Sequence, residues 1–243
     1  SGKTLTLQSL AGLVRPDGGY IKIGDDVLYA SEKGIDLPAR ERHLGYVFQD
    51  YALFPHLTVK QNITLAPVNL KLQTQAEADE KAMRLLERIG LADKADAYPN
   101  KLSGGQKRRV AIAGVLAMNP EVLILDEPTA GLDPKGRDEI LAAIHKLHEE
   151  RGITVILVSH SMEDVARLVD RIIVMHKGKV AMTGTPREIF SHPMELEQMG
   201  LAAPQVSYVF AKLKEKGYDV PTDIYTVEEA RDALLKLVKQ VKA

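Results

Sequence analysis

Short, almost uninterrupted apolar runs alternate with segments of helical periodicity along this chain, and that alternation constrains its fold more than any other feature. Three such runs are Val122–Leu125, Thr154–Val158 and Arg171–Met175. Strands that are apolar on both faces are typical of parallel sheets covered by helices on either side. The sequence therefore predicts an α/β core with a mainly parallel sheet.

Two segments depart from that alternation. Residues 20–29 contain two β-rich runs on either side of Gly24-Asp25-Asp26, a pattern that predicts a hairpin and hence a small antiparallel β insert. Residues 74–118 have mainly helical patterning, which begins with the capping-box pattern Thr74-x-x-Glu77. A helical subdomain is expected there.

Prolines interrupt the regular patterning from Thr183 to Gln205, at positions 186, 193 and 204. We therefore expect a domain boundary at residue 183. The core would span residues 1–182, with the helical subdomain at about 50–118, and a C-terminal helical extension would span residues 183–243.

The composition narrows the classes of function. The 243 residues include no cysteine, which excludes disulfides, thiolate metal sites and cysteine nucleophiles. A total of 32 Lys+Arg against 33 Asp+Glu argues against dedicated nucleic-acid binding. The apolar runs are far shorter than the roughly 20 residues of a membrane-spanning helix. Any role at a membrane is therefore expected to require a partner.

The first four residues, Ser1-Gly2-Lys3-Thr4, match the end of the phosphate-binding pattern GxxxxGK[ST]. In that pattern, backbone N–H groups surround phosphate oxygens, the lysine contacts the β- and γ-phosphates, and the hydroxyl residue holds Mg²⁺. The amphipathic segment that follows would place the anion at a helix N-terminus. A plain helix start is the alternative.

Two adjacent carboxylates, Asp126 and Glu127, follow the apolar run that starts at Val122. Successive side chains of a strand point in opposite directions, so one carboxylate can hold Mg²⁺ through water while the other approaches a water nucleophile. A strand followed by an acidic turn fits equally well.

A third segment, Leu102-Ser103-Gly104-Gly105-Gln106, precedes a long apolar helical pattern. Its hydroxyl group and the free N–H groups of a helix N-terminus could bind a phosphate. A serine N-cap followed by flexible glycines is the alternative.

In their order and spacing, these elements resemble the ATP-binding subunits of ABC transporters over residues 1 to about 180. The matching motifs are the signature pentapeptide Leu102–Gln106, the carboxylate pair Asp126-Glu127, the Q-loop residue Gln49, the D-loop Gly131-Leu132-Asp133 and the switch residue His160. The resemblance implies a P-loop NTPase fold that binds ATP and Mg²⁺.

It also implies that two such subunits hold ATP head to tail. Ser1, Gly2, Lys3 and Thr4 would then bind one nucleotide, while Ser103, Gly104, Gly105 and Gln106 of the same chain would contact the nucleotide of the partner. By the same resemblance, Gln49, Asp133 and His160 would also contact nucleotide.

The resemblance further implies catalytic roles. Glu127 would polarise the attacking water, His160 would contact the γ-phosphate, Lys3 would stabilise its charge, and Gln49 would reach the metal ion and the water. The metal ligands would be Thr4, Gln49 and Asp126.

The implied partners are transmembrane permease subunits and a second ATPase subunit, in a homodimer or a heterodimer, with no nucleic acid. The protein would be peripheral, on the cytoplasmic face of the cell membrane. Residues 50–56 include Tyr51, Phe54 and His56 after the Q-loop residue, which fits a contact with the membrane subunit or a local packing turn.

The sequence departs from the family at its start, where the first part of the phosphate loop and the preceding strand are absent, as in an N-terminally truncated member. We expect the chain to fold poorly alone, which a cooperative thermal transition of a soluble monomer would contradict. A non-hydrolysing, nucleotide-responsive interaction module is the alternative function. Residues 1–60 resemble molybdate-type, residues 62–105 polar amino-acid-type, and residues from Gly104 onward energy-coupling-factor or cobalt-type importer ATPases, so the solute stays open.

Overall fold

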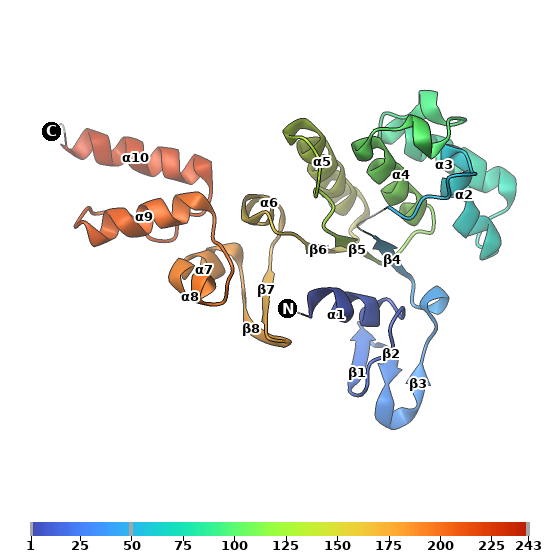
Figure 1. Cartoon of the computed structure of the whole chain (residues 1–243), viewed down its shortest axis with the longest axis horizontal. Helices are drawn as coiled ribbons and strands as arrows, with labels where there is room; N and C mark the ends of the chain where they lie inside the picture. Colours follow the sequence, from blue (N-terminus) through green and yellow to red (C-terminus); the bar gives the residue numbers. More distant parts are fainter. Residues whose placement is uncertain (1, 49–50, 242–243) are drawn as a thin grey trace. The chain divides into compact units, whose positions relative to one another are not determined.

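The computed structural model describes residues 2–48 and 51–241, which form two compact units (Figure 1). Residues 4–158 make up the N-terminal unit. Residues 2–3 and 159–241 make up the C-terminal unit. The domain boundary expected at residue 183 stays a prediction.

A parallel sheet of three strands, in the order β4–β5–β6, forms the centre of the N-terminal unit. The strands are β4 (Leu44–Val47), β5 (Val122–Asp126) and β6 (Thr154–Val158). β5 lies in the middle and is buried from Val122 to Leu125, as the apolar run predicts. β6 pairs with β5 alone among the described strands, so its side chains are only partly buried.

The two faces of β5 pack against different helices. Leu123 and Leu125 belong to the large apolar cluster that α4 and α5 also enter, whereas Val122 and Ile124 pack with Leu7 of α1. The helices of this unit are α1 (Lys3–Leu10), α2 (Val59–Asn69), α3 (Gln75–Arg88), α4 (Gly104–Leu116) and α5 (Pro134–Arg151). The predicted α/β layering is confirmed.

The helical subdomain consists of α2, α3 and α4, which lie side by side in Figure 1 and contact one another. α3 begins at the predicted capping box, in which the Thr74 hydroxyl accepts from the Glu77 N–H and the Glu77 carboxylate accepts from the Thr74 N–H. Leu86, on the apolar face of α3, is fully buried in the shared cluster.

The predicted hairpin is present as β1 (Tyr20–Ile23) and β2 (Asp26–Ala30), which pair antiparallel. A short third strand, β3 (Ile35–Asp36), extends this sheet. Single 3-10 turns occur at η1 (Ser31–Lys33), η2 (Ala39–Glu41), η3 (Ala92–Lys94) and η4 (Pro99–Lys101). The small antiparallel insert is therefore confirmed, with one more strand than the sequence indicated.

The C-terminal unit corrects one expectation about the sheet. After α6 (Met162–Leu168), the apolar run at 171–175 forms β7 (Ile172–His176), which pairs antiparallel with β8 (Lys179–Gly184). Ile173 is 60% exposed. The expectation of a strand covered on both faces is wrong here, because a two-stranded ribbon lets every second side chain face solvent.

The prolines after residue 183 start helices rather than only interrupting structure. Pro186 and Pro193 occupy the first turns of α7 (Pro186–Phe190) and α8 (Pro193–Gln198), and Pro204 precedes α9 (Gln205–Glu215). The fixed φ and missing N–H of proline suit a first helical turn, where the N–H has no intrahelical acceptor.

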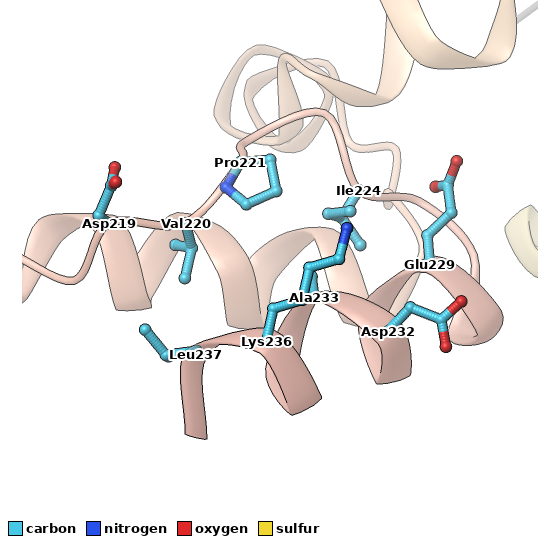
Figure 2. Close-up of a pocket in the computed structure, with 9 residues that line it drawn as sticks. All are labelled: Asp219, Val220, Pro221, Ile224, Glu229, Asp232, Ala233, Lys236 and Leu237. Atoms are coloured by element: carbon cyan, nitrogen blue, oxygen red, sulfur yellow. The ribbon is translucent and has the colours of Figure 1, made fainter. Parts of the chain in front are cut away.

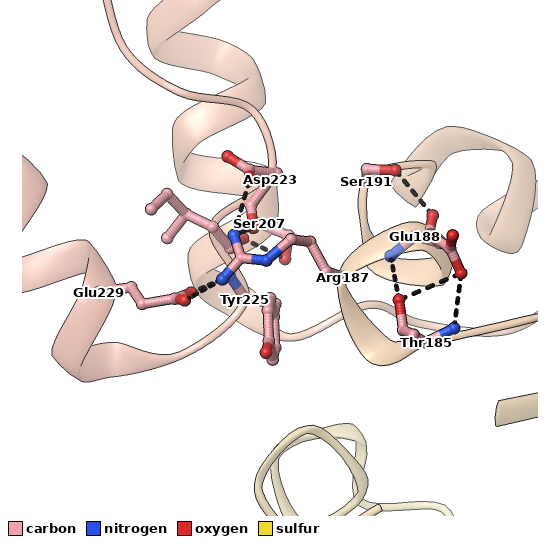
Figure 3. Close-up of polar contacts among 9 residues, drawn as sticks. Thr185, Arg187, Glu188, Ser191, Ser207, Asp223, Tyr225 and Glu229 are labelled. Atoms are coloured by element: carbon pink, nitrogen blue, oxygen red, sulfur yellow. Dashed lines mark hydrogen bonds and ion pairs between the residues drawn. The ribbon is translucent and has the colours of Figure 1, made fainter. Parts of the chain in front are cut away.

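The final helix, α10 (Val227–Val241), packs beside α9 and is linked to α7 by an arginine (Figure 3). Arg187 forms an ion pair with Asp223 at 2.6 Å and another with Glu229, and its guanidinium lies 5.2 Å from the centre of the Tyr225 ring. These groups are partly exposed, so each pair contributes only about 0–1 kcal/mol.

A shallow pocket lies between α10 and the loop that precedes it (Figure 2). Its lining includes the apolar side chains of Val220 and Ile224 and the carboxylates of Asp219 and Asp232. Among the helices that the structure describes, none is long and apolar enough to span a membrane.

Replacement of Leu86 by alanine tests the importance of the helical cluster. We expect Leu86→Ala to lower the free energy of unfolding by about 2–5 kcal/mol, because it leaves a cavity in a fully buried site. Leu72→Ala is the control, since Leu72 is 53% exposed and should change stability by no more than about 0.5 kcal/mol. Urea denaturation of both variants measures the difference; equal losses would contradict the packing described.

Candidate functional site

The predicted phosphate-binding residues lie at the start of α1. Gly2 has φ of 87°, a left-handed conformation that strains any residue with a Cβ, and α1 begins at Lys3. The first N–H groups of a helix have no intrahelical acceptor and favour anions. Thr4 is exposed in this first turn. The helix expected after the GK[ST] pattern is thus present, while Ser1 lies outside the described residues.

Asp126 lies at the carboxyl end of β5 and accepts a hydrogen bond from the Tyr46 hydroxyl at 3.1 Å. Tyr46 pairs in register with Ile124, two residues before Asp126, so the two side chains share the face of the sheet on which α1 packs. Burial raises the pKa of Tyr46 to about 12, helped by the hydrogen bond to Asp126 and by its negative charge.

Glu127 follows in a left-handed backbone conformation with φ of 51°. Its N–H donates to the Val158 carbonyl at 2.9 Å, which holds the turn to the end of β6. The charge of Glu127 acts on the guanidinium of Arg108, which belongs to α4. The two carboxylates thus have different neighbours, Tyr46 for Asp126 and Arg108 of α4 for Glu127. Glu127 lies beyond β5 in a left-handed conformation, so strand alternation does not set its direction, and the divergence expected from alternation stays a prediction.

Arg108 is a buried cation that connects three segments of the N-terminal unit and is 1% exposed. Its guanidinium donates to the Pro128 carbonyl, to the Ala130 carbonyl at 3.1 Å and to the Tyr51 hydroxyl at 2.8 Å. It also lies 4.5 Å from the centre of the Tyr51 ring. Burial lowers the pKa of Arg108, and the charges of Tyr51 and Glu127 oppose that shift.

The Ser-Gly-Gly-Gln segment forms the N-terminus of α4. Ser103 is its N-cap: its hydroxyl accepts from the Gln106 N–H at 3.3 Å, and the Gln106 side chain accepts from the Ser103 N–H at 2.9 Å. The helix-cap alternative is therefore realised. It does not prevent phosphate binding, because a hydroxyl that accepts a hydrogen bond can still donate its own proton. A Cβ at Gly104 would meet no side chain and no other segment within 4 Å, and Gly104 is exposed.

The other predicted residues have different surroundings. Asp133 is the N-cap of α5, where its carboxylate accepts from the Gly136 N–H at 3.2 Å. His160 is exposed after β6 and belongs to the C-terminal unit, as do Gly2 and Lys3. Gln49 lies outside the described residues.

The structure thus adds two residues that sequence reasoning did not assign to the site, Tyr46 and Arg108. In the sequence, Tyr46 is part of a β-rich run and Arg108 is part of a basic run, and neither pattern indicates a site. Because side chains alternate between the two faces of a strand, the register of β4 against β5 would have been enough to place Tyr46 near Asp126. No local pattern indicates the partners of Arg108.

Comparison with known proteins bears on the whole chain. A model of the ABC transporter family matches residues 1–130. The energy-coupling factor transporter ATP-binding protein EcfA2 of Clostridium tetani is 49% identical over 98% of this chain and 82% of its own length. The protein of the same name from Caldanaerobacter subterraneus is 45% identical over 100% of this chain and 84% of its own length.

Solved structures agree. CbiO1 from Clostridium perfringens, part of the ABC transporter complex CbiONQ, is 38% identical and has a TM-score of 0.68, covering 81% of this chain and 78% of its own. The ATP-binding cassette MJ0796, a dimer in a post-hydrolysis state with ADP and Pi, is 31% identical with a TM-score of 0.66, covering 76% and 80%.

The raised pKa of Tyr46, caused by burial and by the hydrogen bond to Asp126, predicts a specific loss of stability at high pH. The folded pKa of about 12 lies above the ordinary 10.0, so the neutral phenol stabilises the fold fully below pH 10, and this contribution is lost as the pH rises to 12. Tyr46→Phe lacks the titrating group. We expect the unsubstituted chain to lose on the order of 1 kcal/mol more than Tyr46→Phe over that interval, after allowance for solvent screening.

Thermal midpoints measured from pH 9 to 12 would show the difference, with Tyr98→Phe as a control on an exposed ring. Identical pH profiles for Tyr46→Phe and the unsubstituted chain would contradict the raised pKa of Tyr46.

Proposed function

The chain belongs to the ABC transporter family of ATP-binding subunits, and from that premise we propose that it is the motor of an energy-coupling-factor-type importer. Membership makes it an ATP-hydrolysing transport subunit. The finer proposal is supported by identities of 45–49% to energy-coupling factor ATP-binding proteins over nearly the whole chain. These alignments include the three segments, 1–60, 62–105 and from Gly104 onward, that separately resemble different importer types. A non-hydrolysing interaction module is not favoured.

The proposed nucleotide contacts come from two helix N-termini. Gly2, Lys3 and Thr4 would bind the phosphates of one ATP at the start of α1. The cap of α4, with Ser103, Gly104, Gly105 and Gln106, would contact the ATP held by a second subunit. The exposed position of Gly104 and the donor capacity of the Ser103 hydroxyl support this assignment.

In the proposed chemistry, Glu127 polarises the water that attacks the γ-phosphate. Its backbone is fixed by the bond to Val158 and by the turn that Arg108 holds. His160 would contact the γ-phosphate, and Gln49 would orient the water. Phosphoryl transfer needs positioning and charge stabilisation more than covalent catalysis. Polar groups of these types are therefore suited to the reaction.

The donor types of the site suit Mg²⁺. One carboxylate, Asp126, and one hydroxyl, Thr4, together with Gln49 and phosphate oxygens, match the oxygen ligands that Mg²⁺ prefers in nucleotide sites. Among the described residues no group of three or more His, Cys, Asp or Glu side chains could hold a metal ion. In nucleotide sites Mg²⁺ usually binds one or two protein ligands together with phosphate oxygens and water. When bound, Mg²⁺ would neutralise phosphate charge.

The proposed partners are transmembrane permease subunits and a second ATPase subunit, with the protein peripheral on the cytoplasmic face of the membrane. We propose that the turn at residues 51–57 contacts the permease. The Asn62 side chain donates to the Phe54 and Leu57 carbonyls and accepts from the Phe54 N–H at 2.8 Å, which fixes this turn. The Phe54 ring is 47% exposed and stacks edge-on near His56. A rigid turn that presents an exposed aromatic ring is typical of an interface anchor.

Phe54→Asp tests this contact. We expect it to weaken co-purification with the transmembrane component at least tenfold, because it places a charge in an apolar interface, while the affinity for ATP stays within twofold. Tyr20→Asp is the matched control, since Tyr20 is an exposed aromatic residue on the antiparallel insert. Unchanged association of Phe54→Asp in a co-expression pull-down, or equal losses for both variants, would refute the contact.

A further inference from the structure

Each of the two segments that Arg108 contacts contains left-handed backbone at residues other than glycine. Among the described residues, seven other than glycine have positive φ: His43, Tyr51, Ala52, Lys71, Asn119, Glu127 and Lys177. Tyr51 and Ala52 follow the Q-loop position, and Glu127 is the proposed catalytic residue. Such a conformation is strained for a residue with a Cβ and persists only where surrounding contacts hold it.

The guanidinium of Arg108 donates to a side chain of one of these segments and to backbone carbonyls of the other. Nη2 donates to the Tyr51 hydroxyl at 2.8 Å and to the Ala130 carbonyl at 3.1 Å, while Nη1 donates to the Pro128 carbonyl. One nitrogen therefore serves both segments at once. The Tyr51 hydroxyl and the Ala130 carbonyl are therefore linked through a single donor atom.

Packing alone does not explain a cation at this position. Arg108 is fully buried, and in the described part of the chain the groups to which it donates are two carbonyls and a hydroxyl, while the carboxylate of Glu127 acts on it through its charge. A buried charge carries a desolvation cost, and apolar side chains of similar volume are often as stable or more so. The planar fork of arginine, by contrast, can bind several acceptors in fixed directions.

We propose that Arg108 is a positioning residue that couples the segment at Tyr51 to the turn that carries Glu127. The inference rests on the proposed function, in which residues 51–57 contact the membrane subunit and Glu127 acts on water. When that contact displaces Tyr51, Arg108 transmits the displacement to the Pro128 and Ala130 carbonyls. The orientation of Glu127 then depends on the state of the membrane subunit.

The first test needs no catalytic activity. Tyr51→Phe removes the hydroxyl but keeps the ring beside the guanidinium, and hydrogen exchange is compared in the peptides that span residues 51–57 and 127–132. We expect exchange in the 127–132 peptide to rise at least threefold, although the substitution lies in the other segment. A change confined to residues 51–57 would overturn the proposal.

The second test uses steady-state ATP hydrolysis by Tyr51→Phe, Arg108→Lys and the double variant. We expect Arg108→Lys to lower kcat at least tenfold with KM for ATP within threefold, because lysine keeps the charge but cannot reach all three acceptors. Tyr51→Phe should lower kcat less, and the double variant should be no slower than Arg108→Lys. Multiplicative effects of the two substitutions would contradict coupling through one guanidinium.

Arg109→Lys is the matched control. Arg109 is adjacent and partly buried, but it donates to the Ile89 carbonyl and pairs with Glu139, so it contacts neither strained segment. An equal loss of kcat in Arg109→Lys would assign the effect to general destabilisation and overturn the proposal. Absence of hydrolysis in the unsubstituted chain would instead count against the proposed function, and the exchange experiment would still decide the coupling.

Discussion

The burial of β5 between two apolar layers determines where the other candidate groups of the N-terminal unit lie. Leu123 and Leu125 hold one face against α4 and α5, while Val122 and Ile124 hold the other against α1. A shift of β5 by one residue would exchange the side chains that meet each layer and disturb close packing on both faces. The direction of Asp126, the last residue of β5, is a consequence of that packing.

The same layering connects the two proposed phosphate-binding helices to the carboxylates. α1 packs on the face where Asp126 and Tyr46 meet, and α4 carries both the Ser103 cap and Arg108, whose guanidinium reaches the turn after Glu127. Each helix thus lies on a different side of the strand that supplies the proposed metal ligand and general base. In the N-terminal unit, one apolar core positions groups that the sequence separates widely.

Features that depend on local patterns were predictable from the sequence. The hairpin at Gly24, the capping box at Thr74 and the buried strand at Val122 each follow from short-range preferences, and the structure confirms them. The run that begins at Arg171 was wrongly expected to be covered on both faces, since apolar content does not reveal how many strands lie beside it.

The contacts of the candidate site depended on long-range geometry and could be predicted only in part. The hydrogen bond from Tyr46 to Asp126 spans 80 residues, and that from Arg108 to Tyr51 spans 57. Only the register of the sheet and the packing of α4 bring these groups together. The roles of Lys3, Gln49 and His160 stay predictions.

The central claim is that the turn after β5 carries the group that activates water for ATP hydrolysis. Steady-state phosphate release by the chain and by Glu127→Gln, with ATP affinity measured in both, tests it most directly. The account predicts hydrolysis that falls about 100-fold or more in Glu127→Gln, because a general base of this kind contributes about 10²–10⁴ in rate, while ATP binding is retained. Equal rates of phosphate release in the two proteins would contradict it.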